Sequence, residues 1–173
     1  MLWEGAQMRK LIIGGIVAVI VLGLVACGNE APDAAADQAR MQSDYWQIDQ
    51  IEKDFHGAMT TKNIDLMMSL FAPNATMTVG PGATATGLDE IRAFWLTKAA
   101  PFAPQNHWVS DHPAYKLEIT VNGDRGTLHF ECHYIDVETE EVASATTADF
   151  DVARIDGRWL ITNMVGGTTI LEI

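Results

Sequence analysis

The chain has 173 residues, of which 23 are acidic and 11 basic, giving a formal net charge of −12 at pH 7. A surface this acidic repels nucleic acid and anionic lipid head groups, so no nucleic-acid partner is expected. The length suits one domain with a sizeable hydrophobic core.

The first 26 residues have the features of an export signal. Arg9 and Lys10 precede an apolar run over residues 11–25, which is shorter than the about 20 residues that a membrane-spanning helix needs. The run ends in LVAC at residues 24–27, which resembles the lipobox of bacterial lipoproteins. In that family the chain is cut before the cysteine, and the cysteine is lipidated, with acyl chains such as palmitate.

This resemblance implies a signal peptide over residues 1–26 and a lipid anchor at Cys27. The protein is then expected in the bacterial cell envelope (the periplasm, for example), held to a membrane with its domain outside the cytoplasm. An uncleaved signal anchor is the alternative, and Met8 is an alternative start to Met1. With Cys27 committed to lipid, Cys132 has no partner for a disulfide.

We predict a flexible tether over residues 27–43 and a folded domain over residues 44–173. The stretch from 28 to about 40 is rich in Ala, Asp and Pro and has no large apolar residue, which is typical of a solvated linker.

The first half of the domain predicts three helices. Apolar residues recur every three or four positions over 45–59, which indicates one buried helical stripe. A second helix follows Asn63 as N-cap and ends before Pro73. Residues 75–79 predict a short strand, residues 80–87 a turn-rich hairpin, and residues 88–100 a third helix. The second helix should bury Leu66, Met67, Leu70 and Phe71, and the third Ile91, Phe94 and Trp95.

After Pro104 the apolar pattern changes to a period of two residues, which predicts strands. Segments 114–121 and 126–137 are joined across Asn122, Gly123 and Asp124, a strong hairpin signal because Asn-Gly tolerates positive φ. Segments 142–155 and 158–165 are joined by a second short turn. Three helices followed by an antiparallel meander predict an α+β fold with helices on one face of a curved sheet.

The order of these segments resembles the SnoaL-like branch of the nuclear transport factor 2-like (NTF2-like) superfamily over residues 45–165. The segments that carry the resemblance are GLDEIRAFW at 87–95, the turn at 123–124 and GRW at 157–159. The resemblance implies a cone-shaped domain, with a curved antiparallel sheet packed against three N-terminal helices around a pocket. Members are often dimers through the sheet, so a homodimer is possible, but such fold markers name no reaction.

The stretch HFECHYID at 129–136 gathers several polar side chains on one predicted strand. Alternate residues of a strand face opposite sides, so Cys132 and Tyr134 point inward while His129, Glu131 and His133 point outward. The two histidines are about 13 Å apart on a strand and cannot chelate one metal by themselves. No metal site and no cofactor are therefore expected.

The resemblance allows family patterns of catalytic residues to be tested. Ketosteroid isomerases carry a general-base aspartate where this sequence has Val79, which argues against isomerase chemistry. Scytalone dehydratase-like members use a tyrosine–aspartate pair, aligned here with Met59 and Thr60. Their two histidines have candidates in His107 and in His129 or His133.

Polyketide cyclases of the SnoaL branch use an aspartate acid–base in the pocket. Asp149 and Asp151 are the nearest candidates, but alternation places both on the outer face beside inward Phe150 and Val152. The catalytic candidates are therefore His107, His133 and Tyr134.

An apolar, aromatic and methionine-rich interior is easier to predict than a reaction. Such a lining suits a hydrophobic ligand held by a few polar groups, although the same residues could simply fill a core. Asn163, two residues beyond Ile161, should add an inward amide. The predicted lining residues are Phe55, Met59, Met67, Phe71, Phe94, Trp95, Trp108, Phe130, Tyr134, Trp159, Ile161 and Asn163.

The leading hypothesis is an envelope lipoprotein whose SnoaL-like domain binds a small hydrophobic molecule without a recognised catalytic set. One alternative is a dehydratase-like lyase or isomerase acting on a hydrophobic hydroxy or carbonyl compound, with His107 as base and Tyr134 or a strand histidine assisting. Another is a protein-interaction or dimerisation module that uses the open face of the sheet.

Overall fold

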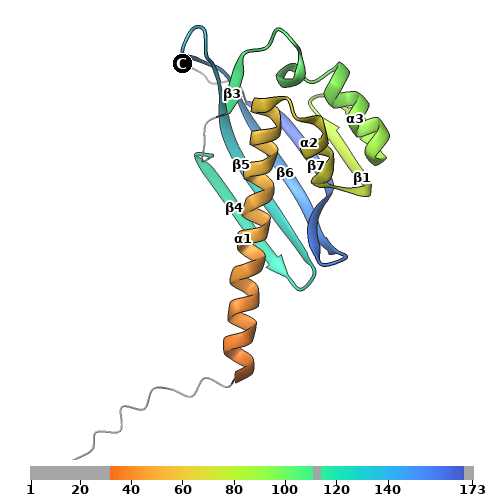
Figure 1. The fold of residues 1–173 in the computed structure, drawn as a ribbon, viewed down its shortest axis with the longest axis vertical. Coiled ribbons are helices and arrows are strands. Elements are labelled where there is room, and N and C mark those ends of the chain that lie inside the picture. The colour runs from red at the N-terminus through yellow and green to blue at the C-terminus, as the bar shows by residue number, and fades with distance from the viewer. Residues whose placement is uncertain (1–31, 111–113, 170–173) are drawn as a thin grey trace, which may run out of the picture.

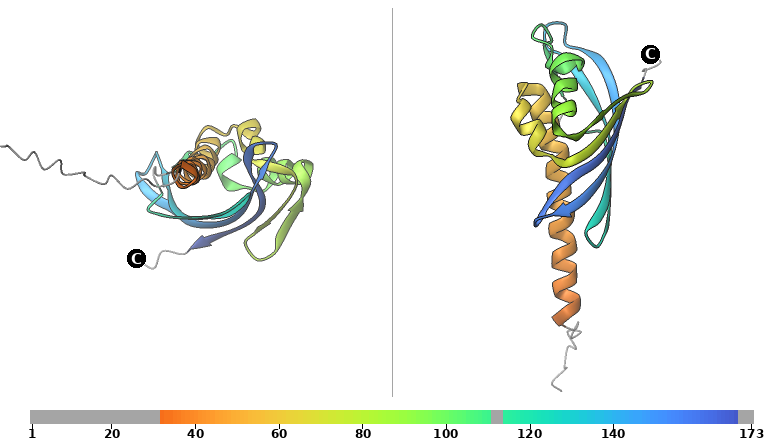
Figure 2. Two further views of the ribbon diagram at one scale, coloured as in Figure 1. Left: turned by 90° about the horizontal axis from the view of Figure 1, so that it is seen from below. Right: turned by 90° about the vertical axis from the view of Figure 1, so that its right-hand side faces the viewer.

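One curved sheet and three helices packed against its concave face form the domain (Figures 1 and 2). The computed structural model describes residues 32–110 and 114–169. The helices are α1 (Pro32–Thr61), α2 (Ile64–Ser69), α3 (Gly87–Thr97) and the short 3-10 helix η1 (Ala100–Phe102). The strands are β1 (Phe71–Val79), β2 (Ala83–Thr86), β3 (Trp108–Ser110), β4 (Lys116–Asn122), β5 (Arg125–Asp136), β6 (Glu141–Ile155) and β7 (Arg158–Thr169). The predicted α+β class and the helical layer on one face of the sheet are confirmed.

The sheet is mixed, whereas the sequence predicts an antiparallel one. Its strand order is β2-β1-β7-β6-β5-β3, and β4 also pairs with β5. The meander from β4 to β7 and the β1–β2 hairpin are antiparallel as predicted, but β1 runs parallel to β7. Hairpin patterns specify only neighbours along the chain, so this long-range pairing leaves no signal in them.

Helix α1 begins much earlier than its apolar stripe indicates and projects beyond the sheet (Figure 1). The prediction of a flexible tether is wrong for residues 32–43, which are helical, although residues 33–43 are exposed as expected of a solvated segment. Alanine is the strongest helix former, proline is favoured in the first turn, and the early Asp33 complements the helix dipole. The signal peptide, Cys27 and the rest of the tether lie outside the described residues.

The short helix α2 starts as predicted. The Asn63 side chain accepts a hydrogen bond from the Leu66 backbone N–H at 3.0 Å, which is the geometry of an N-cap. The predicted strand at 75–79 extends back to Phe71, and α3 ends at Thr97 rather than at residue 100. Within the parts of the chain that the structure describes, no helix combines the length and apolarity needed to cross a membrane.

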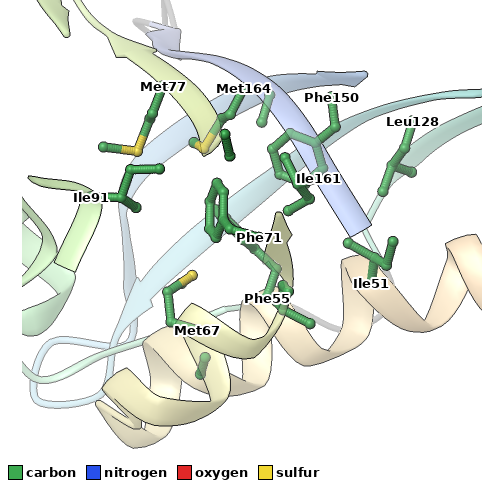
Figure 3. Close-up of a cluster of buried hydrophobic side chains, with 14 of the residues drawn as sticks. Ile51, Phe55, Met67, Phe71, Met77, Ile91, Leu128, Phe150, Ile161 and Met164 are labelled. Atoms are coloured by element: carbon green, nitrogen blue, oxygen red, sulfur yellow. The ribbon is translucent and has the colours of Figure 1, made fainter. Parts of the chain in front are cut away.

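The core lies between α1, α2, α3 and the concave face of the sheet (Figure 3). The alternation predicted for β5 is confirmed, because the even-numbered residues 128–134 are all buried, while His129, Glu131 and His133 are only half-buried. Ile51 and Phe55 of α1 meet Phe150 and Ile161 from the two central strands in this core.

Buried polar side chains fix α1 against the sheet. Asp44 is buried and pairs with the guanidinium of Arg154 on β6, and it also accepts a hydrogen bond from Trp159 Nε1 at 3.3 Å. The Arg154 guanidinium lies over the Trp159 ring, 4.8 Å from its centroid. About two to three turns further along the buried side of α1, His56 and Glu52 form a second pair, with 2.8 Å between Nδ1 and Oε1 and exposures of 0% and 1%. Charged groups this deeply buried are stable only when paired.

Candidate functional site

A cavity of about 420 Å³ opens between the helical layer and the sheet. Its walls come from α1, the segment from α3 to η1, and the inner faces of β5, β6 and β7. Val79 at the end of β1 and Trp108 at the start of β3 complete the described lining. A ligand would thus lie inside the concave face of the sheet.

The inner wall of the cavity is aromatic and sulfur-rich. Phe55 packs against Phe130 and Trp95 with ring centroids 5.7 and 5.6 Å apart, and the Trp108 ring stacks on Tyr134 at 6.0 Å. The lining also includes Met59 and Met164, and methionine adapts to irregular apolar shapes.

A few polar groups interrupt this apolar wall. The Tyr134 hydroxyl donates a hydrogen bond to Met59 Sδ at 2.7 Å. Thr146 Oγ1 lies 3.2 Å from Cys132 Sγ. Ser144, two residues before Thr146 on β6, also lines the cavity. Among the described lining residues, Lys98 is the only charged one.

The structure divides the predicted pocket residues into two groups. Met67, Phe71, Trp159 and Ile161 are buried in the core but do not line the cavity. The prediction that Phe94 is buried is wrong, because it is half-buried at the cavity wall. The predicted residues that line the cavity are Phe55, Met59, Phe94, Trp95, Trp108, Phe130 and Tyr134.

Asn163 points away from the cavity, contrary to the prediction. Asp151 pairs with Asn163 and Val152 with Ile161, so Thr162 is an extra residue in β7 at a β-bulge. A bulge shifts the alternation by one residue, which turns Asn163 outward and Met164 inward. On the outer face the Asn163 amide oxygen accepts a hydrogen bond from Thr76 Oγ1 at 2.7 Å, and the amide nitrogen donates one to Asp151 Oδ2 at 3.2 Å.

His107 does not reach the cavity. Its side chain is 47% exposed, and Nδ1 lies 2.7 Å from Oε1 of the exposed Glu138. A dehydratase-like base must be within hydrogen-bond reach of a bound substrate. The location of His107 removes it from that role.

The strand histidines lie on the outer face of the sheet, as their alternation predicts. His133 stacks against Tyr115 with ring centroids 4.5 Å apart. His129 pairs with Asp149 at 2.8 Å and with Glu131 at 3.4 Å. Asp149 and Asp151 are exposed on the same face, so neither is a cyclase-type acid in the cavity. Of the three catalytic candidates, only Tyr134 lines the cavity.

Glu131 on this outer face is held strongly in its charged form. Hydrogen bonds from Lys116 and Tyr115 lower the pKa of Glu131 from its usual 4.5 to about 2, and His129 adds to the effect. No group of three or more potential metal-binding side chains occurs within residues 32–110 and 114–169. The outer face is therefore a network of surface ion pairs.

Several features of the interior were not predicted from the sequence. Met164 was not predicted to line the cavity because the bulge shifts the alternation of β7. Lys98 was not predicted to line it because it lies at the C-cap of α3, among residues without a clear pattern. The buried carboxylates Asp44 and Glu52 were also not predicted, although they lie on the same side of α1 as Ile48 and Phe55. Their spacing along the apolar stripe was the available signal.

Comparison with known proteins identifies the family. The sequence model of the SnoaL-like domain matches residues 40–165. The chain belongs to the SnoaL-like family. This family lies within the NTF2-like superfamily, so the match confirms the resemblance found in the sequence. A comparison with curated proteins found no match.

Solved structures show the same fold at low sequence identity. An NTF2-like protein with a cystatin-like fold from Novosphingobium aromaticivorans is 16% identical, with a TM-score of 0.69 over 84% of this SnoaL-like chain and 93% of its own. A structure from Shewanella frigidimarina described as a candidate ketosteroid isomerase is 21% identical, with a TM-score of 0.56 over 68% of this chain and 91% of its own. A candidate dehydratase of the NTF2-like family from Streptomyces avermitilis is 13% identical, with a TM-score of 0.60 over 75% of this chain and 98% of its own. At these identities the likeness shows the fold alone.

Proposed function

We propose that this SnoaL-like domain binds a small, mainly apolar molecule in its cavity and performs no acid–base chemistry on it. The observation that carries the proposal is the composition of the cavity wall: its described residues include no aspartate, glutamate or histidine. Isomerases of the superfamily would place an aspartate at the position of Val79, and dehydratase-like members a tyrosine at that of Met59; both of these apolar residues line the cavity.

The size and chemistry of the cavity support ligand binding. Small-molecule sites are typically about 300–1,000 Å³, mostly apolar, with a few polar groups that orient the ligand. The cavity of about 420 Å³ falls in this range. Aromatic walls and hydroxyl groups such as those of Tyr134 and Ser144 fit that description.

The two alternative functions receive less support. A dehydratase-like lyase would keep Tyr134 as a hydrogen-bond donor but would lack His107 as its base. An interaction module predicts a filled core and an apolar outer sheet face. Here the core contains a cavity, and the outer face carries charged side chains such as Glu131, Asp149 and Asp151.

A fragment covering residues 32–173 is suitable for testing the proposal. It contains every described helix and strand. In the Novosphingobium structure the same fold accounts for 93% of the chain.

Native mass spectrometry of this fragment, purified from the native host without detergent, tests for an occupied cavity. We expect a reproducible extra mass that is lost on denaturation. Replacing Ala148, which lines the cavity, by leucine should fill part of the space and abolish the extra mass. Ala93→Leu makes the same change at an exposed position of α3 and should retain it. The same spectra report whether the protein is a homodimer.

The proposal fails if the wild-type fragment carries no extra mass and also takes up no added 1-decanol. It equally fails if the Ala148→Leu variant keeps the ligand with unchanged occupancy, because the ligand would then lie elsewhere.

We also propose that the domain is anchored to a membrane of the bacterial cell envelope through a lipid on Cys27. The support is the sequence alone: a basic start, a short apolar run and the LVAC segment at residues 24–27. Cys27→Ser should abolish incorporation of labelled palmitate and release the protein from membranes, while Cys132→Ser should change neither. Unchanged labelling of Cys27→Ser would refute the anchor.

A further inference from the structure

We infer that the ligand of the cavity is an amphipathic monocarboxylate, with its head group between the Trp95 indole N–H and the Lys98 ammonium. This inference rests on the proposed binding function and specifies its ligand class. It follows from two hydrogen-bond donors on neighbouring turns of α3 and from the absence of charged acceptors in the described wall.

The first donor is a buried indole N–H. Trp95 lines the cavity and is only 5% exposed, and Trp95 Nε1 has no hydrogen-bond partner among the described residues. Its aromatic neighbours Phe55 and Phe102, with centroids 5.6 and 5.7 Å away, offer only ring faces. Burying an N–H without an acceptor is unfavourable, and native proteins rarely tolerate it. The nitrogen itself has almost no accessible surface, so a ligand oxygen at this wall satisfies the donor once a packed side chain moves aside.

The second donor is a cation without a counterion. Lys98 follows Trp95 by three residues at the C-cap of α3, so both side chains reach the same wall. Lys98 is exposed, and no described carboxylate lies within ion-pair distance of it. In a chain with a net charge of −12, an unpaired lysine at a cavity is available to an anionic ligand.

The rest of the wall selects an apolar body. Phe55, Phe130 and Met164 line the cavity and are apolar, with at most weak hydrogen-bond acceptors. The described lining contains no carboxylate that would attract a cationic ligand. An uncharged ligand would leave Lys98 unused, whereas a carboxylate can accept from both donors at once.

Calorimetric titration of the 32–173 fragment with decanoate and with 1-decanol tests the inference. Lys98→Met should weaken decanoate binding about three- to tenfold, the range of a partly exposed charge pair, and leave 1-decanol binding within about twofold. Lys98→Arg should retain decanoate binding. Lys53→Met removes a lysine from the outer side of α1 and should change neither affinity.

Trp95→Phe removes the N–H but keeps an aromatic ring. It should weaken decanoate and 1-decanol about three- to tenfold each, because both ligands carry an oxygen acceptor. Circular dichroism and thermal unfolding confirm that each variant is folded, and Lys98→Met at an exposed position should fold as the wild type does.

The outcomes separate the two proposals. Equal binding of both ligands with no effect of Lys98→Met would overturn the carboxylate inference and leave a general apolar site. Binding of neither ligand would overturn the binding function and the inference together. The expected result is that Lys98→Met weakens the binding of decanoate but not of 1-decanol, and that Lys98→Arg retains decanoate binding.

Discussion

Glu131 shows how its neighbours tune a single half-buried carboxylate. Lys116 Nζ lies 2.9 Å and the Tyr115 hydroxyl 3.0 Å from its two oxygens. These donors lower the pKa of Glu131 to about 2, so the carboxylate is charged at every ordinary pH. The folded-state pKa lies below the unfolded one, so the stabilisation is present above about pH 4.5 and is lost as the pH falls toward 2.

Lys116→Met should raise the pKa of Glu131 toward its usual 4.5, because the largest cause of the depression is removed. The side-chain carboxyl shift of Glu131, followed by NMR during acid titration, measures this directly. The variant should also be less stable than the wild type at neutral pH, with the difference vanishing at low pH. A wild-type pKa near 4.5 would contradict the prediction, and Lys53→Met, remote from β5, serves as control.

At the residue scale, sequence reasoning succeeds where a periodic pattern sets the direction of a side chain. Cys132 and Tyr134 face inward because β5 alternates without interruption. His107 could not be placed in this way, because it precedes the three-residue strand β3 in a loop. Its contact with Glu138 depends on the β5–β6 turn, a tertiary relation that no local pattern encodes.

At the element scale, one extra residue decides the face of a whole strand end. The period-two rule assigns Asn163 inward, and the bulge at Thr162 reverses that assignment for everything after it. The helix N-cap at Asn63 and the hairpin at Gly123 were predictable because their chemistry is local. The start of α1 was not, because an exposed alanine-rich helix has no apolar stripe to reveal it.

Two glycines on facing elements should respond to alanine with opposite signs. A Cβ on Gly126 of β5 would lie 2.4 Å from the Thr120 carbonyl oxygen and 3.3 Å from Ile48 Cδ1 on α1. Gly126→Ala should therefore destabilise the fold by about 1–3 kcal/mol. A Cβ on Gly57 in α1 would meet nothing within 4 Å, so Gly57→Ala should stabilise it by about 0.5–1 kcal/mol.

Urea unfolding of the two variants beside the wild type measures both changes. A stabilising Gly126→Ala would show that β4 and β5 do not approach as closely at Gly126 as described. A destabilising Gly57→Ala would show that this part of the helix contacts something else.

At the scale of the whole molecule, the projecting part of α1 and the packed domain are separable. Residues 33–43 are exposed, and the ion pair between Arg40 and Asp124 lies at the surface, with 3.2 Å between Arg40 Nη2 and Asp124 Oδ1. Starting the fragment at residue 42 should change the free energy of unfolding by less than about 1 kcal/mol, since exposed ion pairs contribute little.

A fragment that starts at residue 49 provides the contrasting case. It also loses buried Asp44 and Ile48, which leaves Arg154 without its buried partner and opens the core. We expect a loss of at least about 3 kcal/mol. Thermal and urea unfolding of the two truncations compare them, and equal stabilities would refute the buried role of Asp44.

The position of β7 between β1 and β6 has a consequence for the order of folding. Strand β7 joins the β1–β2 hairpin to the remaining strands, so a growing polypeptide cannot close its sheet before β7 has been synthesised. Until then β1 and β6 each present an unpaired edge, a state prone to association with other chains. The cavity wall, which needs Met164 and Gly166 from β7, also forms only in that last step. The ligand binding proposed above would thereby be restricted to molecules in which β7 has docked.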